Sequence, residues 1–167
     1  MDGTFVPNIS YGFPIVEAIA KIATKPLDAH LMIVHPEKYV DRFAKVGVQM
    51  LSFHLNAVDN AGQVLAQIRA AGMSPGLAIN PDIPVEKLFP YLDQCDYVVL
   101  MSVFAGFGGQ KFIEATYNRV ETLKAEIERQ GVECLIQVDG GVSAANSAAQ
   151  VSTILYTGNI PFSLRRL

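Results

Sequence analysis

The chain has 167 residues, of which 50% are hydrophobic and 17% are charged, and its formal net charge is -3. This length and composition predict one folded domain and exclude a disordered chain. Because the sequence has no basic run and no apolar stretch near the roughly 20 residues of a membrane span, we expect neither a nucleic-acid nor a membrane partner. The N-terminus lacks the features of a signal peptide and the two cysteines lack metal-ligand spacing, which predicts a cytoplasmic protein with free thiols or a single disulfide.

Apolar strands alternate with amphipathic helices along the chain. The first twelve residues are rich in turn formers, and a helix is expected from Pro14 to about Ala23 with no strand before it. Further helices are expected at 36–46, 60–71, 84–92, 112–130 and 144–151, and strands at 27–33, 50–55, 75–79, 97–103, 135–138 and 153–156. This alternation predicts an α/β fold, with a parallel sheet covered by helices.

Polar residues stand at nearly every strand end, and their distribution separates two α/β architectures. They are His30, His54, Asn80, Ser102 and Asp139. A doubly wound sheet would concentrate such residues at one switch point, whereas a barrel gathers them around its mouth. The pattern therefore favours a TIM (β/α)8 barrel type, incomplete because only about six strands are visible.

The strand that ends in Asp139, Gly140 and Gly141 is the most informative. A carboxylate there can act as an acid, a base or a metal ligand, and the glycines allow backbone N–H groups to approach a phosphate. The alternative is a surface turn in which Asp139 caps the next helix. We interpret the pattern as chemistry on a phosphorylated small molecule.

The three histidines receive different interpretations. His30 shares a strand face with Asp28, so it can point into the barrel mouth toward the axis that Asp139 faces, as a metal ligand or a proton donor; the alternative is a hydrogen-bonded core histidine. We interpret His54 as a residue that supports a metal ligand or orients the substrate, rather than as a ligand itself. His35 is expected to face solvent at the start of a helix.

Residues 101–112 contain the densest glycines of the chain, between a strand and a long helix. Such glycines can gather N–H groups around phosphate oxygens, although the spacing matches neither a Walker loop nor a dinucleotide fingerprint. The hinge of a flexible lid is the alternative. Met32 and Met101 at strand ends could form an apolar floor under a substrate, with core packing as the alternative.

Four segments together resemble the ribulose-phosphate 3-epimerase family: MDGTFVPN at 1–8, LDAHLM at 27–32, GFGGQKF at 106–112 and VDGGV at 138–142. The resemblance covers about residues 1–146. It implies a (β/α)8 barrel that holds one divalent metal ion (Zn, Fe, Mn or Co) with two His and two Asp. It also implies interconversion of D-ribulose 5-phosphate and D-xylulose 5-phosphate, by proton transfer at C3 through an enediolate.

The same resemblance assigns roles to particular residues. His30 resembles a metal ligand, and Asp139 resembles both a metal ligand and one of two catalytic acid/base groups. The positions that resemble substrate or phosphate contacts are His30, Met32, Met101, Gly106, Phe107, Gly108, Gly109, Gly140, Gly141, Gly158 and Asn159.

The sequence also departs from the family pattern. Members carry a His-x-Asp pair on the strand directly before Met-Asp-Gly, whereas this sequence begins at that Met, so we expect a single barrel-type domain over 1–167 that lacks the first βα unit and the last helix. Phe104-Ala105 replaces a polar residue and a proline, and residues 146–167 diverge. Three interpretations stay open: an epimerase, an inactive epimerase-like remnant that still binds phosphate, and another sugar-phosphate barrel enzyme. Open sheet edges predict pairing with another chain, including formation of a homo-oligomer.

Overall fold

A computed structural model describes residues 1–147 and 154–157 of the chain. Its strands form one six-stranded sheet in sequence order: β1 (Asp28–Leu31), β2 (Met50–His54), β3 (Ser74–Ile79), β4 (Tyr97–Met101), β5 (Leu135–Asp139) and β6 (Ile154–Thr157). Each neighbouring pair is parallel. All six predicted strands are therefore confirmed, as is the α/β class.

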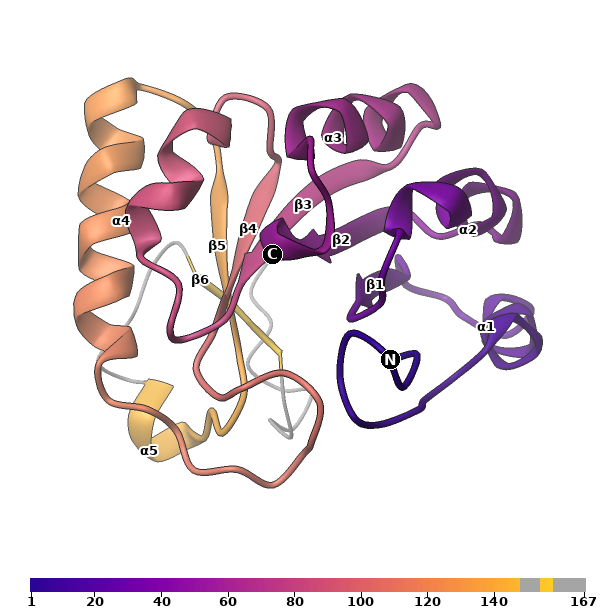
Figure 1. Ribbon diagram of the computed structural model, residues 1–167, viewed down its shortest axis with the longest axis horizontal. Helices are drawn as coiled ribbons and strands as arrows, with labels where there is room; N and C mark the ends of the chain where they lie inside the picture. The colour runs from indigo at the N-terminus through magenta and orange to yellow at the C-terminus, as the bar shows by residue number, and fades with distance from the viewer. Residues whose placement is uncertain (148–153, 158–167) are drawn as a thin grey trace.

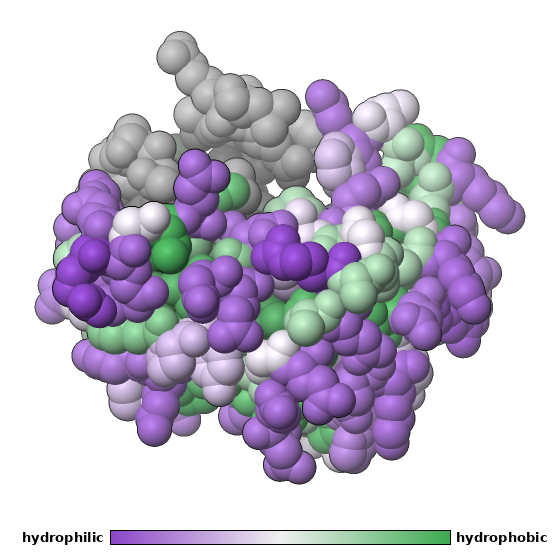
Figure 2. All heavy atoms as spheres, turned by 90° about the horizontal axis from the view of Figure 1, so that it is seen from above, coloured by the Kyte–Doolittle hydropathy of each residue, from purple (hydrophilic) through white to green (hydrophobic). Residues whose placement is uncertain are grey.

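Helices surround the sheet on its outer side (Figure 1). They are α1 (Phe13–Ala20), η1 (Pro36–Tyr39), α2 (Val40–Val46), η2 (Leu55–Ala57), α3 (Ala61–Ala70), η3 (Val85–Tyr91), α4 (Thr116–Gln130) and α5 (Ala144–Ser147), where η marks a 3-10 helix. The apolar sides of α3 and α4 bury Leu65, Ile68 and Leu123 against the outer face of the sheet. Seen from above, the surface is mainly hydrophilic, with apolar side chains in small patches (Figure 2). No helix among the described residues is long and apolar enough to cross a membrane.

The sheet is curled into part of a barrel. The Tyr97 hydroxyl on β4 and the Gln137 amide on β5 both donate to the Asp28 carboxylate on β1, each at 3.1 Å. In a flat sheet, β1 and β5 would be four strand spacings of about 4.8 Å apart, or roughly 19 Å, which is beyond the reach of these side chains. The incomplete barrel that the strand ends predict is therefore confirmed.

Gly76 on β3 makes room for Tyr97 on the concave side of the sheet. A Cβ at Gly76 would lie 2.4 Å from a Tyr97 ring carbon and 2.8 Å from the Cβ of Ser52. The bare backbone lets the Tyr97 ring lie across β3 and bring its hydroxyl to Asp28. One glycine thus permits the contact between the two sides of the curled sheet.

Some predicted element bounds differ from the structure. The helix predicted at 84–92 is the 3-10 helix η3 (Val85–Tyr91), because Pro90 within it has no N–H for an α-helical hydrogen bond. The helix predicted from residue 112 begins at Thr116, since the Ile113 N–H donates to the Ser102 carbonyl and holds the preceding segment against the end of β4. Residues 148–151 of the last predicted helix, and Gly158 and Asn159, lie outside the described residues.

Candidate functional site

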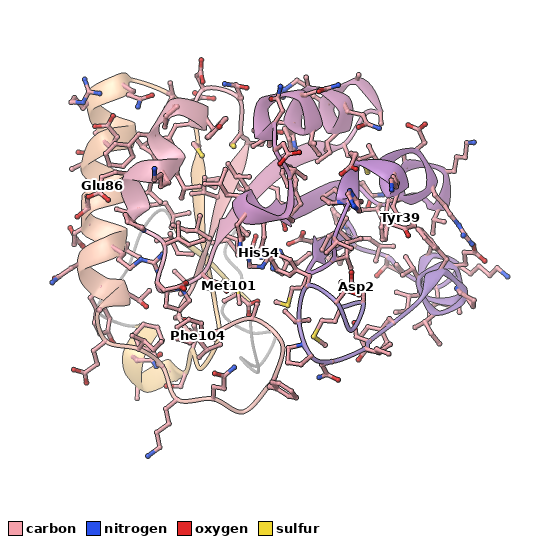
Figure 3. All side chains as sticks on the ribbon, in the orientation of Figure 1. Asp2, Tyr39, His54, Glu86, Met101 and Phe104 are labelled. Atoms are coloured by element: carbon pink, nitrogen blue, oxygen red, sulfur yellow. The ribbon has the colours of Figure 1, made fainter. Side chains whose placement is uncertain are left out.

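Two histidines meet at the strand ends of β1 and β2. The Nε2 atoms of His30 and His54 are 3.1 Å apart, and their ring centroids are 4.9 Å apart. His30 Nδ1 lies 2.8 Å from the hydroxyl of Ser52. Figure 3 shows His54 near the middle of the molecule. His30 thus lies on the concave face, as its alternation with Asp28 predicts.

The direct contact between the two rings is a feature that the sequence analysis missed. His30 is the register partner of Ser52, so His54 is its diagonal neighbour on the same face of the next strand. Alternation along two adjacent parallel strands was the signal that could have revealed it. Predicting the contact also requires the register of β1 against β2, which the sequence does not specify.

Burial keeps both imidazoles neutral. It lowers the pKa of His54 to about 4. Burial also lowers the pKa of His30 to about 3, with the neighbouring His54 and the N-terminal ammonium group adding to the effect. A neutral imidazole is the form that binds metal ions. The Nδ1 atom of His54 is buried and has no hydrogen-bond partner among the described residues.

The N-terminal loop covers the histidine pair. The Phe5 ring packs on His54, with the centroids 4.9 Å apart. The Asp2 carboxylate accepts hydrogen bonds from the N–H groups of Thr4, Phe5 and Val34, which fasten the loop to the end of β1. Desolvation opposes ionisation of Asp2, but these hydrogen bonds outweigh it and lower its pKa. This role of Asp2 was not predicted from the sequence.

The concave face also holds a small apolar cluster and the hydrogen bonds of Tyr97 and Gln137 to Asp28. Burial, and then the Asp28 charge, raise the pKa of the Tyr97 hydroxyl, which stays protonated as a donor. Met101 is fully buried in this inner cluster with Tyr97, and the half-buried Met32 packs against it. The two methionines therefore do line the concave side, and for Met101 core packing is the observed role.

The glycine-rich loops after β4 and β5 pack against each other. Ser102 donates its N–H and its hydroxyl to the Asp139 carbonyl at 2.8 and 2.9 Å, and its hydroxyl also contacts the Gly140 carbonyl. A Cβ at Gly141 would lie 2.6 Å from the backbone nitrogen of Phe112, so only glycine allows this approach. The structure therefore places the two predicted phosphate loops side by side.

The N-terminal loop reaches the same region. The Asn8 amide donates to the Gly106 carbonyl at 2.8 Å, and Gly106 packs near Val6. In Figure 1 residues 1–12, the loop after β4 and α5 lie on the same, lower side of the molecule. Gly106, Gly109, Gly140 and Gly141 all have positive φ. Phe107, by contrast, is largely exposed.

Arg119 is a second residue that the sequence analysis missed. It reaches from α4 to the ends of the strands, where its guanidinium donates to the carbonyls of Met101 and Asn80, each at 3.0 Å, and of Ile83 at 3.2 Å. Desolvation lowers the pKa of Arg119, and the nearby Asp82 charge opposes this. Arg119 therefore fixes the loops after β3 and β4 to the helix layer.

The donor chemistry of the histidine pair fits a transition-metal ion. Both rings are neutral, and the Ser52 hydroxyl contacts the far nitrogen of His30, as is usual for ligating histidines. Asp139 lies at the end of β5, partly exposed. Within residues 1–147 and 154–157, no group of three or more His, Cys, Asp or Glu side chains is placed to hold one ion.

Comparison with known sequences gives a consistent match. A family model described as the ribulose-phosphate 3 epimerase family matches residues 1–155. The chain is 44% identical over 149 residues to ribulose-phosphate 3-epimerase of Synechocystis sp., covering 88% of this chain and 65% of that protein. It is 41% identical over 151 residues to ribulose-phosphate 3-epimerase of Aquifex aeolicus, covering 90% of this chain and 68% of that protein. The chain thus spans about two thirds of the length of these relatives.

Comparison with solved structures supports the fold. Two structures of mutant tryptophan synthase alpha-subunit from Pyrococcus furiosus match with TM-scores of 0.63 and 0.65, at 18% and 17% sequence identity. Each match covers 87% of this chain and 61% of the other chain. At this level of identity the likeness shows the fold alone.

Proposed function

This chain belongs to the ribulose-phosphate 3-epimerase family, and from that premise we propose that the protein interconverts D-ribulose 5-phosphate and D-xylulose 5-phosphate. The family match over residues 1–155 is the observation that carries the proposal. Because the chain spans about two thirds of its relatives' length, the activity and the substrate are proposed for the whole protein. Its described residues are proposed to form most of a single ribulose-phosphate-binding barrel domain.

Asp139 is the proposed acid/base group. The C3 proton of ribulose 5-phosphate is adjacent to the C2 carbonyl, so its removal leaves an enediolate whose charge is shared by two oxygens. Asp139 takes this proton, and its backbone is held for the task by the two hydrogen bonds from Ser102. Return of a proton to the opposite face of C3 produces xylulose 5-phosphate, which requires a second acid on that face.

The glycine loops are the proposed phosphate site. The proposal rests on the packing of the loop after β4 against the loop after β5, which brings two sets of backbone N–H groups to one side of the sheet. The residues assigned to it are Gly106, Phe107, Gly108, Gly109, Gly140, Gly141, Gly158 and Asn159. Met32 is proposed to line the apolar side of the substrate site, with the buried Met101 supporting it from the inner cluster against which Met32 packs.

His30 and Asp139 are the proposed protein ligands of a divalent ion. Such an ion (Zn, Fe, Mn or Co) supplies electrostatic stabilisation of the enediolate oxygens when it is bound. Two other residues support this site: Ser52 keeps the His30 ring oriented, and Phe5 limits the access of water to His30 and His54.

The proposal is tested by following conversion of ribulose 5-phosphate with and without Asp139. We expect xylulose 5-phosphate to form with the unaltered protein and the rate to fall at least 1000-fold in Asp139→Asn, which keeps the shape of the side chain but cannot act as a base. Unphosphorylated ribulose is the matched control substrate and should bind at least tenfold more weakly in calorimetry. Equal rates in both proteins would exclude Asp139 as the base.

A further inference from the structure

The glycine loop between β4 and α4 is closed on itself by a side chain of its own. The Gln110 amide nitrogen, Nε2, donates to the Phe104 carbonyl at 2.7 Å and to the Phe107 carbonyl at 2.8 Å (Phe104 is labelled in Figure 3). An amide nitrogen carries two protons, so both are used inside the loop. Gln110 therefore joins the beginning, the middle and the end of residues 104–110.

Two asparagines from other parts of the chain hold the same loop. The side-chain oxygen of Asn80, which follows β3, accepts the N–H of Ala105 at 3.2 Å, and the Asn8 amide donates to the Gly106 carbonyl at 2.8 Å. Ala105 stands where the family pattern has a proline, which has a restricted φ and no N–H to make this bond. Side-chain amides thus restrain the loop at a position where the backbone is freer than that of a proline.

These contacts occupy carbonyls of the loop and leave N–H groups for a ligand. The carbonyls of Phe104, Gly106 and Phe107 all accept side-chain amides. By contrast, the N–H groups of Gly108 and Gly109 donate to no group in the part of the chain that the structure describes. A Cβ at either glycine would have no atom within 4 Å, so the backbone there is open to a ligand. Neighbouring N–H groups of this kind are typical contacts of a phosphate.

We propose that Gln110 is a positioning residue for the substrate phosphate: its amide holds the loop in the shape that presents the N–H groups of Gly108 and Gly109. This inference rests on the proposed function and adds a residue that is not among the assigned phosphate contacts. Gln110 acts through the loop, because both of its amide protons are donated to loop carbonyls. Without them the loop has more conformations, so binding of a phosphate includes the entropy cost of ordering it. Affinity for the phosphate should therefore fall, whereas proton transfer in the bound complex should change little.

The experiment replaces the amide with a side chain of similar length that cannot donate. Gln110→Met is compared with Gln130→Met, the matched control, because the Gln130 amide also donates twice, to the Phe89 carbonyl at 3.1 Å and to Glu126 at 2.7 Å. Gln130 is the last residue of α4 and lies away from the loop. Inorganic phosphate is the probe, and the backbone amide resonances of Gly108 and Gly109 report its binding in ¹⁵N NMR titrations. We expect Gln110→Met to bind phosphate about tenfold more weakly and Gln130→Met to keep the affinity of the unaltered protein.

Kinetics separate positioning of the phosphate from a general loss of structure. In Gln110→Met the KM for ribulose 5-phosphate should rise about tenfold with kcat nearly unchanged, whereas a fall in kcat at unchanged KM would overturn the proposal. Equal phosphate affinity in folded Gln110→Met and the unaltered protein would also overturn it.

A measurement on the unaltered protein decides the question even if Gln110→Met does not fold. Phosphate should shift the Gly108 and Gly109 resonances, and the side-chain amide protons of Gln110 should exchange slowly with solvent. Unshifted glycine resonances, or Gln110 protons that exchange as fast as those of an exposed glutamine, would overturn the proposal. Phosphate binding that depends on Gln110 without any epimerisation would contradict the proposed function alone.

Discussion

At the scale of single residues, the concave side of the sheet depends on a few close contacts. The Asp28 carboxylate accepts hydrogen bonds from strands β4 and β5, and the Tyr97 hydroxyl reaches it across the backbone of Gly76. His30 and His54 form the next layer toward the loops. Each of these positions tolerates little change in side-chain volume or charge, which makes them suitable for direct tests.

The close approach at Gly76 predicts a loss of stability on adding one methyl group. Gly76→Ala would push the Tyr97 ring away from Asp28, and overpacking of this kind costs about 1–3 kcal/mol. The measurement is the free energy of unfolding from urea denaturation. Gly108→Ala is the control, since no atom lies within 4 Å of a Cβ at Gly108, and it should change stability by less than about 0.5 kcal/mol. If Gly76→Ala lost no more free energy of unfolding than Gly108→Ala, the Tyr97 ring would have room to move.

From the buried histidine pair we predict that the free energy of unfolding decreases as the pH is lowered below about 6.5. An unfolded chain takes up protons on histidine near pH 6.5, whereas the folded chain resists protonation of His54 until about pH 4. The stabilisation is therefore fully present above pH 6.5 and is lost as the pH falls. For His54 alone the loss from pH 7 to pH 5 is about 2 kcal/mol.

Urea unfolding in the presence of a metal chelator measures this pH effect. His54→Gln should have a shallower dependence than the unaltered protein, and His35→Gln the same dependence. A free energy of unfolding that stays constant between pH 7 and pH 5 would show that the pair is readily protonated in the folded state.

At the scale of elements, α4 is tied to the strand ends by one side chain. Arg119 donates to three carbonyls that follow β3 or end β4. Because hydrogen bonds from a charged group to buried acceptors contribute about 1.5–3 kcal/mol, Arg119→Met should reduce the free energy of unfolding by about 2–3 kcal/mol. Arg129→Met, which removes the ion pair of a largely exposed Arg129 side chain with Glu126, should cost less than about 1 kcal/mol. Equal losses would show that Arg119 does not anchor the helix.

The strands could be predicted from the sequence, whereas several helix bounds could not. Short apolar runs between turn residues specify β2 to β5 closely, and Gly47 and Gly131 end α2 and α4 with positive φ, a conformation that favours glycine. The start of α4 depends on the Ile113–Ser102 hydrogen bond, a contact between segments that a local pattern does not contain. That η3 is a 3-10 helix and not an α-helix could have been inferred from Pro90.

For the candidate site, the sequence predicted where some residues lie in the fold but not the contacts between them. The position of His30 on the concave face and the glycines after β4 and β5 follow from strand alternation and turn chemistry. The contact of His30 with His54, the capping by Phe5 and the anchoring by Asp2 depend on strand register and on where the N-terminal loop folds back. These are long-range contacts, which single-sequence patterns do not determine.

At the scale of the whole molecule, the described sheet has β1 and β6 as its two end strands. Next to β1 in sequence, α1 contributes no fully buried residue, and Ile15 and Ile19 on it, as well as Ile22 shortly after its end, are exposed. Unpaired strand edges and exposed apolar side chains favour association between copies of the chain. We therefore predict concentration-dependent self-association in analytical ultracentrifugation.

Changing α1 tests which surface is responsible. Ile19→Lys with Ile22→Lys should shift the equilibrium toward the monomer, whereas Lys124→Ala on α4, at the other end of the molecule from α1 (Figure 1), should not. A single monomeric species of the unaltered chain at all concentrations would contradict the prediction.

The proposed function requires Asp139 to act as a base on a pentulose 5-phosphate whose phosphate is bound by the glycine loops. The most direct measurement is exchange of the C3 proton of ribulose 5-phosphate in deuterated water, followed by proton NMR. We predict loss of the C3 signal with the unaltered protein and retention of that signal with Asp139→Asn. Exchange at the same rate in both proteins, or no exchange with the unaltered protein, would contradict the claim.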